Sequence, residues 1–141
     1  MIHLANSHLI AILDHAQQSY PCECCGLLIG TRNDQGISTI TKIAQSPNMT
    51  TSSAADTFEL DPQIRFEVMR NLRGGHEEII GHYHSHPDHP AQPSKTDLNM
   101  AFEPDLIWLI ASVTKNSPGD VTAWRLNRDT QTIKSVSITI S

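Results

Sequence analysis

The chain has 141 residues and a net charge of −5, with 15 acidic residues against 10 basic ones. This length fits one ordinary domain, so we expect a single domain over residues 1–141, with a core that needs no disulfide framework. The acidic balance and the lack of any run of five basic residues disfavour contact with a phosphate backbone, and we expect no nucleic-acid partner.

The N-terminal segment MIHLANSHLIAILDH has no charged residue ahead of its apolar ones, and polar residues interrupt it. It therefore predicts neither a signal peptide nor a membrane span. Cys22, Cys24 and Cys25 fall within four positions, and without a secretion signal they favour a reducing compartment. We expect a cytoplasmic protein with no membrane partner.

The first half of the chain predicts a helix, a pair of strands, a loop and a short strand. Asn6 is a good N-cap, and Pro21 ends the helical spacing of apolar residues that follows it. The strand-forming segments are CGLLIGTR (25–32), GISTITKIAQ (36–45) and TFEL (57–60). The segment NDQG is a turn between the first two strands, and the polar segment SPNMTTSSAAD (46–56) predicts a mobile loop.

The second half predicts two helices and four strands. Asp61 and Pro62 open a helix that stops at Gly74, and Ser94 caps a helix over SKTDLNMAFE (94–103). The predicted strands are EEIIGHYHSHP (77–87), DLIWLIASV (105–113), GDVTAWRL (119–126) and TIKSVSITI (132–140), and the near-continuous apolar run of the second predicts a central strand. Because helices and strands do not alternate regularly, we expect an α+β fold, a mixed β-sheet flanked by two or three helices.

The segment HYHSHPDHPAQPSKTD concentrates metal-ligating side chains. On a strand, His84 and His86 point to the same face about 6–7 Å apart, and two imidazoles so placed can bind one ion. The turn after Pro87 lets the helix that begins at Ser94 swing back, so that Asp97 supplies an oxygen ligand. Two imidazoles and a carboxylate suit zinc, and three protein ligands leave a position for water, as in catalytic sites.

A hydrolytic site also needs a general base and a donor for the developing oxyanion. Ser94 lies at the start of the helix predicted to carry Asp97 and can be that donor. A role as helix cap would by itself be sufficient to explain a serine at this position. Glu23 lies at the mouth of a predicted strand and can supply the base; the alternative is an ordinary surface carboxylate.

These residues resemble a known family. HSHPDHPAQPSKTD is similar to the JAMM motif of the MPN-plus metallopeptidases: His, any residue, His, Pro, six residues, Ser, two residues, Asp. The glutamate in PCECCGLLIG resembles the segment that carries the general base of that family. FELDP, GHYHSHP, PSKTDL and IWLIASV are similar to the small bacterial stand-alone Mec-type peptidases, so the resemblance extends from about residue 9 to residue 126.

The resemblance implies a JAB/MPN fold, which is related to cytidine deaminases. It implies one catalytic zinc ion per chain, bound by His84, His86 and Asp97, with Glu23 as general base and Ser94 polarising the substrate carbonyl. It also implies hydrolysis of an amide bond after the Gly-Gly tail of a ubiquitin-like sulfur-carrier protein of the ThiS or MoaD kind. An extended tail laid along a sheet edge fits this expectation. Members of the family often self-associate, so a homodimer is an open alternative.

Three other interpretations fit these residues less well. A non-catalytic MPN-type interaction module does not need the complete ligand set. A zinc deaminase would need His-x-Glu ahead of the Pro-Cys-x-x-Cys in PCECC, and a cysteine zinc site would need a second pair of thiols; the sequence has neither. His82 shares its strand face with His84, but a fourth protein ligand would close the site, so we expect that His82 does not bind the metal. We expect His89 to face solvent near the cleft.

Overall fold

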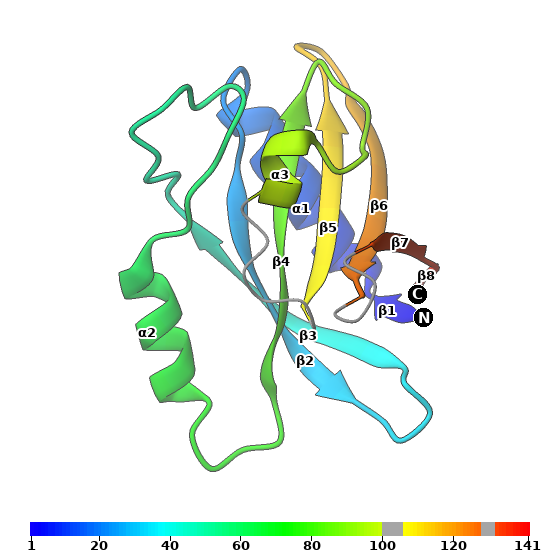
Figure 1. The fold of residues 1–141 in the computed structure, drawn as a ribbon. Helices are drawn as coiled ribbons and strands as arrows, with labels where there is room; N and C mark the ends of the chain where they lie inside the picture. Colours follow the sequence, from blue (N-terminus) through cyan, green and yellow to red (C-terminus); the bar gives the residue numbers. More distant parts are fainter. Residues whose placement is uncertain (100–105, 128–131) are drawn as a thin grey trace.

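A computed structural model describes residues 1–99, 106–127 and 132–141, and within these ranges an eight-stranded mixed sheet is flanked by three helices (Figure 1). The strands are β1 (Ile2–Leu4), β2 (Cys25–Arg32), β3 (Ser38–Ser46), β4 (Glu78–Pro87), β5 (Ile107–Val113), β6 (Pro118–Leu126), β7 (Ile133–Val136) and β8 (Ile138–Ile140). The helices are α1 (Asn6–Ser19), α2 (Pro62–Asn71) and α3 (Lys95–Asn99). The predicted α+β architecture is confirmed.

The sheet order is β7-β6-β5-β4-β2-β3-β1-β8. Strand β4 lies in the middle, antiparallel to β2 and parallel to β5. The apolar run predicted to be central is β5, an almost fully buried interior strand between β4 and β6. Strand β4 therefore has a neighbour on each side, and this pairing fixes its position in the sheet.

Helix α1 packs on the face of the sheet that carries Tyr83. Ile12 and Ala16 are the buried residues of the helix, and His15 Nδ1 lies 2.8 Å from the hydroxyl of Tyr83. The Tyr83 ring in turn occupies the space above Gly26, where an added Cβ would lie 2.3 Å from a ring carbon. Because side chains alternate along a strand, the neighbours of Tyr83 on β4 point to the opposite face, which is free of α1.

The two ends of the sheet meet. Strand β7 pairs with β6 at one end, β8 pairs with β1 at the other, and only Ser137 separates β7 from β8. The amide of Ile2 donates to the Ser137 carbonyl at 2.9 Å, and the two termini lie close together (Figure 1). The prediction of a single last strand over residues 132–140 is therefore wrong, and strand β1 was not predicted.

Two further local predictions need correction. Helix α1 begins at Asn6 as expected, but its N-cap is Ala5, which makes no side-chain capping hydrogen bond. Residues 57–60 do not form a strand; Leu60 makes only an isolated bridge with Asn48. Extended propensity in a four-residue segment is a weak signal when no neighbouring strand is free to pair with it. Of the helix predicted over 94–103, residues 100–103 lie outside the described ranges.

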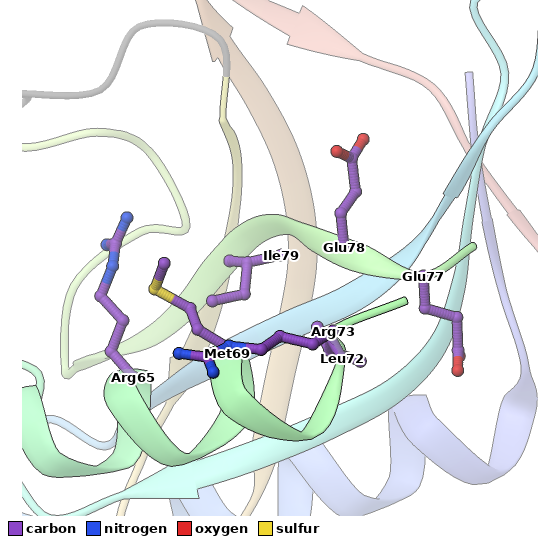
Figure 2. Close-up of a pocket in the computed structure, with 7 residues that line it drawn as sticks. All are labelled: Arg65, Met69, Leu72, Arg73, Glu77, Glu78 and Ile79. Atoms are coloured by element: carbon purple, nitrogen blue, oxygen red, sulfur yellow. The ribbon is translucent and has the colours of Figure 1, made fainter. Parts of the chain in front are cut away.

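Helix α2 begins as predicted, because the side chain of Asp61 accepts a hydrogen bond from the Gln63 amide at 2.9 Å. No residue of α2 is buried, and a groove of about 320 Å³ separates the helix from the start of β4. Figure 2 shows Arg65 and Met69 of α2 and Ile79 of β4 along this groove. None of the described helices is long and apolar enough to cross a membrane.

Candidate metal centre and catalytic site

Strand β4 presents two histidines on the face opposite Tyr83. His84 is fully buried, His86 is 5% exposed, and their Nε2 atoms lie 3.2 Å apart. The main chain of β4 is fixed on one side by β2, where Cys25 is opposite His84, and on the other by β5. The backbone therefore holds both imidazoles in one place before any ligand is bound.

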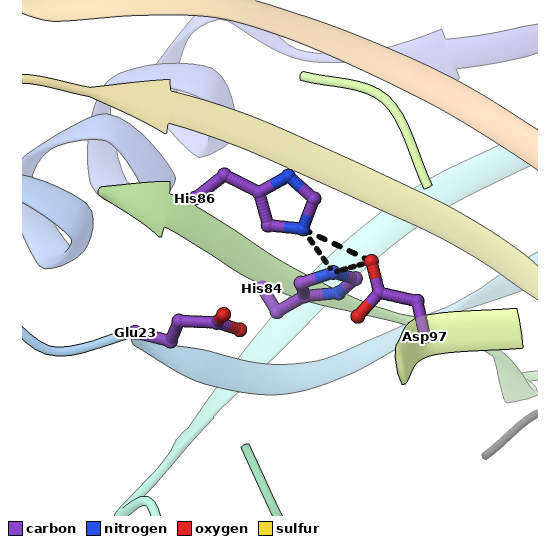
Figure 3. Close-up of side chains that lie close together, drawn as sticks. All are labelled: Glu23, His84, His86 and Asp97. Carbon is purple, nitrogen blue, oxygen red and sulfur yellow. Dashed lines mark hydrogen bonds and ion pairs between the residues drawn. The ribbon is translucent and has the colours of Figure 1, made fainter. Parts of the chain in front are cut away.

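The first turn of α3 adds a carboxylate to this pair. Ser94 Oγ accepts from the Asp97 amide at 3.0 Å, and the Ser94 amide donates to Asp97 Oδ2 at 2.9 Å, so the two residues cap the helix reciprocally. The same Oδ2 atom lies 3.1 Å from His84 Nε2 and 3.0 Å from His86 Nε2 (Figure 3). The turn over residues 88–93 thus returns the chain to the histidines, as the sequence predicts.

These three atoms are placed so that together they could bind a metal ion. His86 Nδ1 lies 2.9 Å from the carbonyl oxygen of Pro90, which can only accept, so the ring proton is on Nδ1 and Nε2 carries a lone pair. Burial alone would raise the pKa of Asp97, but the imidazoles of His84 and His86 beside it, together with the Ser94 amide, outweigh burial and hold the pKa below its usual value. Two imidazole nitrogens and an ionised carboxylate converging on one point suit a zinc ion.

Glu23 reaches the same place from the segment that precedes β2. The Cys24 amide donates to Ser85 Oγ at 2.8 Å, and the Ser85 amide donates to the Cys24 carbonyl at 3.1 Å. This double contact joins the start of β2 to β4 between the two histidines. Ligand atoms of Glu23, His84, His86 and Asp97 all lie within 4.8 Å of one another, and the Glu23 carboxylate points toward the other three (Figure 3).

The electrostatic environment of Glu23 differs from that of Asp97. Burial raises the pKa of Glu23 to about 8, with a smaller lowering by His86 and a smaller raising by Asp97. Among the described residues, its buried Oε1 atom has no hydrogen-bond partner. A carboxyl group with a pKa near neutrality can both accept and release a proton, which suits a general base and acid.

A cleft of about 310 Å³ opens over these groups. It is lined by Glu23, Asp56, His86, His89, Ser94 and Thr96. His89 therefore lines the cleft, consistent with its expected place near it, and Asp56 is an acidic lining residue that the sequence did not indicate. A substrate in this cleft would contact the base, one histidine and the start of α3 together.

The loop before α2 is organised by Asn48, which the sequence analysis did not single out. Its Nδ2 atom donates to the carbonyl oxygens of Glu23 at 3.2 Å and Thr57 at 3.0 Å. Its Oδ1 atom accepts from the amides of Thr50 at 3.1 Å and Glu59 at 3.0 Å. Asn48 therefore joins the loop to the main chain of the proposed base. The only sequence signal at this position, an Asn-Met-Thr tripeptide, concerns glycosylation.

We expect Asn48→Ala to leave Glu23 less firmly positioned. The loss of these bonds should lower the free energy of unfolding by about 1–3 kcal/mol, the cost of unsatisfied polar groups. Hydrolysis should slow while the metal content stays unchanged. Thermal unfolding, elemental analysis and a rate assay check this, with Asn71→Ala at an exposed position of α2 as the control. Equal stability of the two variants would contradict this role for Asn48.

Phe58 supports the buried histidine from the same loop. Its ring stacks on that of His84, with centroids 4.4 Å apart and an interplanar angle of 19°. This contact explains why residues 57–60 leave the sheet, because Phe58 packs over the site rather than pairing as a strand. In the sequence, no feature marked Phe58 as part of the site, and FELDP contributed only to the family resemblance.

The cysteines are not part of the site. Cys22 is exposed, whereas Cys24 and Cys25 are buried, and burial raises their pKa values to about 11 and about 12, respectively. Buried thiols of this kind stay protonated and are poor metal ligands. Among the described residues, the only group able to hold a metal contains no cysteine, and it does not include His82.

A buried His-His-Asp group, with a carboxyl of raised pKa beside it and a cleft above it, is the arrangement of a metal-dependent hydrolase. Comparison with known proteins agrees with this class. Residues 5–127 match the family described as prokaryotic homologs of the JAB domain, and the chain belongs to this family.

Relatives whose names state an activity narrow the class further. A desampylase of Haloferax volcanii is 31% identical over an alignment of 109 residues, and the match covers 72% of this chain and 73% of the relative. A CysO-cysteine peptidase of Mycobacterium tuberculosis is 28% identical over 117 residues, which are 82% of this chain and 76% of the relative. A solution structure of a Desulfitobacterium hafniense protein superposes with a TM-score of 0.85 at 29% identity, covering 100% of this chain and 93% of that one. The chain is an enzyme, a peptidase of the JAMM type.

Proposed function

We propose that this enzyme is a zinc-dependent peptidase in which His84, His86 and Asp97 hold one ion and Glu23 is the general base. The observation that carries the proposal is the convergence of these four buried side chains from three separate segments onto one point. A zinc ion held there would supply Lewis acidity, which lowers the pKa of water and polarises an amide carbonyl.

The protein groups around that point divide the remaining work. Glu23 accepts the proton of the attacking water and delivers it to the departing amine, since its raised pKa and its position in the cleft allow both transfers. Ser94 accepts one hydrogen bond from the Asp97 amide, and its own proton can be donated to the carbonyl oxygen of a substrate in the cleft. Capping and donation thus use different parts of the same hydroxyl.

Ser94→Ala separates these two uses. We expect hydrolysis to slow by roughly 10²–10³, as for loss of an oxyanion donor. The lost cap should also lower the free energy of unfolding by about 1 kcal/mol. Ser94→Thr keeps the hydroxyl and should retain most of the hydrolysis rate and of the free energy of unfolding. If Ser94→Ala loses stability but hydrolyses as fast as the wild type, Ser94 is only a cap.

We propose a ubiquitin-like sulfur carrier of the ThiS or MoaD kind as the substrate, cut after its Gly-Gly tail. Two relatives support this class by name, the desampylase and the CysO-cysteine peptidase. The cleft runs between the loop that carries Asp56 and the first turn of α3, and glycine is the residue that passes most easily through a confined approach to buried groups.

The sequence predicts a tail that lies along a sheet edge, but the strands beside the site have no free edge. Strands β2 and β4, which flank the site, are both interior and are paired on both sides. A tail therefore enters along the cleft-lining loop and α3 instead of extending β2 or β4. The interaction-module alternative is set aside, because the similar relatives are named as peptidases.

Intact mass spectrometry tests this proposal. A carrier extended by cysteine or a short peptide after Gly-Gly is incubated with the zinc-loaded enzyme, with Glu23→Gln as the control. The proposal expects loss of only the residues beyond Gly-Gly, and no loss with the variant. If such carriers remain intact while unrelated peptides are cut, the sulfur-carrier assignment fails and the metallopeptidase remains.

A further inference from the structure

The two histidines of the site differ in how their second ring nitrogen is supported. A metal-ligating imidazole normally bonds through its other nitrogen to a group that fixes the tautomer and the orientation of the ring. For His86 that group is the Pro90 carbonyl, 2.9 Å from Nδ1. For His84, Nδ1 is buried and has no hydrogen-bond partner among the described residues. Burying such an atom unpaired is costly, so a partner is expected.

A small cavity lies beside His84. It measures about 30 Å³ and is lined by Phe58, His82, His84, Asp97 and Trp108. This is room for one or two water molecules, and an ordered water needs at least two polar partners. His84 Nδ1 can be one partner of the water and His82 Nδ1 the second. His82 Nδ1 is also buried and without a hydrogen-bond partner in the part of the chain that the structure describes.

The walls of the cavity restrict where a water can bond. Phe58 stacks flat on His84, and Trp108 lies against His82 with ring centroids 5.6 Å apart. The rings of His82 and His84 have centroids 5.8 Å apart, and neither Nδ1 atom has a hydrogen-bond partner among the described residues, so a bridge between them would run through a water. His82 and His84 therefore share an aromatic enclosure, and within the described ranges the Nδ1 atom of each has no protein partner.

We propose that a buried water bridges His84 Nδ1 and His82 Nδ1, which makes His82 a positioning residue for the metal ligand His84. This inference rests on the proposed metal-binding role of His84. The Nδ1–H of His84 donates to the water, and the water donates to Nδ1 of His82, whose own proton is on Nε2. The proton on His84 Nδ1 leaves the lone pair on Nε2, which faces His86 and Asp97.

Two substitutions at position 82 separate hydrogen bonding from packing. His82→Phe keeps a ring between Phe58 and Trp108 but removes the acceptor for the water. His82→Asn places an amide group near the position of Nδ1 and keeps a polar partner. Zinc affinity is measured by competition with a chelator, and the visible spectrum of the cobalt-substituted protein reports ligand geometry.

We expect His82→Phe to bind zinc about 10–100-fold more weakly, the range for loss of a group that supports a metal ligand. Its cobalt spectrum should shift, and His82→Asn should recover most of the affinity and the wild-type spectrum. The metal-free His82→Phe protein should melt no lower than the wild type, since its packing is kept. Wild-type zinc affinity and cobalt spectrum in His82→Phe would overturn the proposal.

A second measurement uses the wild type alone and does not depend on a variant that folds. Nitrogen-15 NMR of the zinc-loaded protein labelled at histidine should show His84 protonated on Nδ1 and His82 protonated on Nε2. The reverse assignment for His82 would refute the bridge. A wild-type protein that binds no zinc would refute the proposed function itself, so the two failures are distinguishable.

Discussion

Replacing His84 or His86 by alanine is expected to abolish zinc binding and hydrolysis together. Either change leaves one imidazole and Asp97 as metal ligands. Among the described residues, Glu23 is the only other member of the metal-binding group, so no further imidazole can replace the lost one. Activity should fall by at least about 10⁴-fold, the upper end for loss of a general base alone, because the activated water is lost as well. Elemental analysis and a rate assay on the same preparation measure both effects.

The matched control for these variants is His76→Ala, which removes an exposed histidine. It should retain one zinc ion per chain and wild-type activity. A His84→Ala protein that keeps stoichiometric zinc would show that the ion is bound elsewhere. Folding is verified by thermal unfolding, since His84 is fully buried and stacked on Phe58.

The second large effect is expected from Glu23→Gln. The amide has the size of the carboxyl group but cannot take up the proton of water, so hydrolysis should slow by about 10²–10⁴-fold. Zinc should remain, because the two histidines and Asp97 are untouched. Glu59→Gln, which changes an exposed glutamate of the neighbouring loop, is the control. A Glu23→Gln enzyme as fast as the wild type would remove Glu23 from the reaction.

Metal-free protein offers an independent check on the environment of Glu23. Burial raises the pKa of this carboxyl from 4.5 to about 8. Ionisation is therefore easier in the unfolded chain, so the wild type should lose stability relative to Glu23→Gln as pH rises from about 4.5 to about 8 and no further above that. Thermal unfolding of both proteins across this range measures the difference. Parallel curves would mean that Glu23 is solvated in the folded protein.

The parts of the site that are close in sequence could be predicted from local rules. The alternation of side chains along a strand places His84 and His86 together, and a serine cap three residues ahead of Asp97 begins α3. The arrival of Glu23 depends on the register that pairs Cys25 with His84 across β2 and β4. In the sequence, only the place of Glu23 at the mouth of a predicted strand and the family resemblance connected these positions, because register between distant strands is not a local property.

The parts that escaped prediction depend on contacts between distant segments. The last strand splits at Ser137 because one half pairs with β6 and the other with β1, and nothing in its alternating pattern marks that division. Asn48 bonds both to its own loop and to Glu23, and Phe58 packs on a histidine of another element. Residues of this kind are identified by their partners, which the sequence does not show.

Zinc titration of metal-free enzyme tests the central claim most directly. Wild-type protein is stripped with a chelator and dialysed, and hydrolysis of a carrier extended beyond Gly-Gly is followed as zinc is added back. The account predicts no hydrolysis without metal and a linear recovery that saturates at one zinc ion per chain. Undiminished hydrolysis by protein that contains no metal would contradict it.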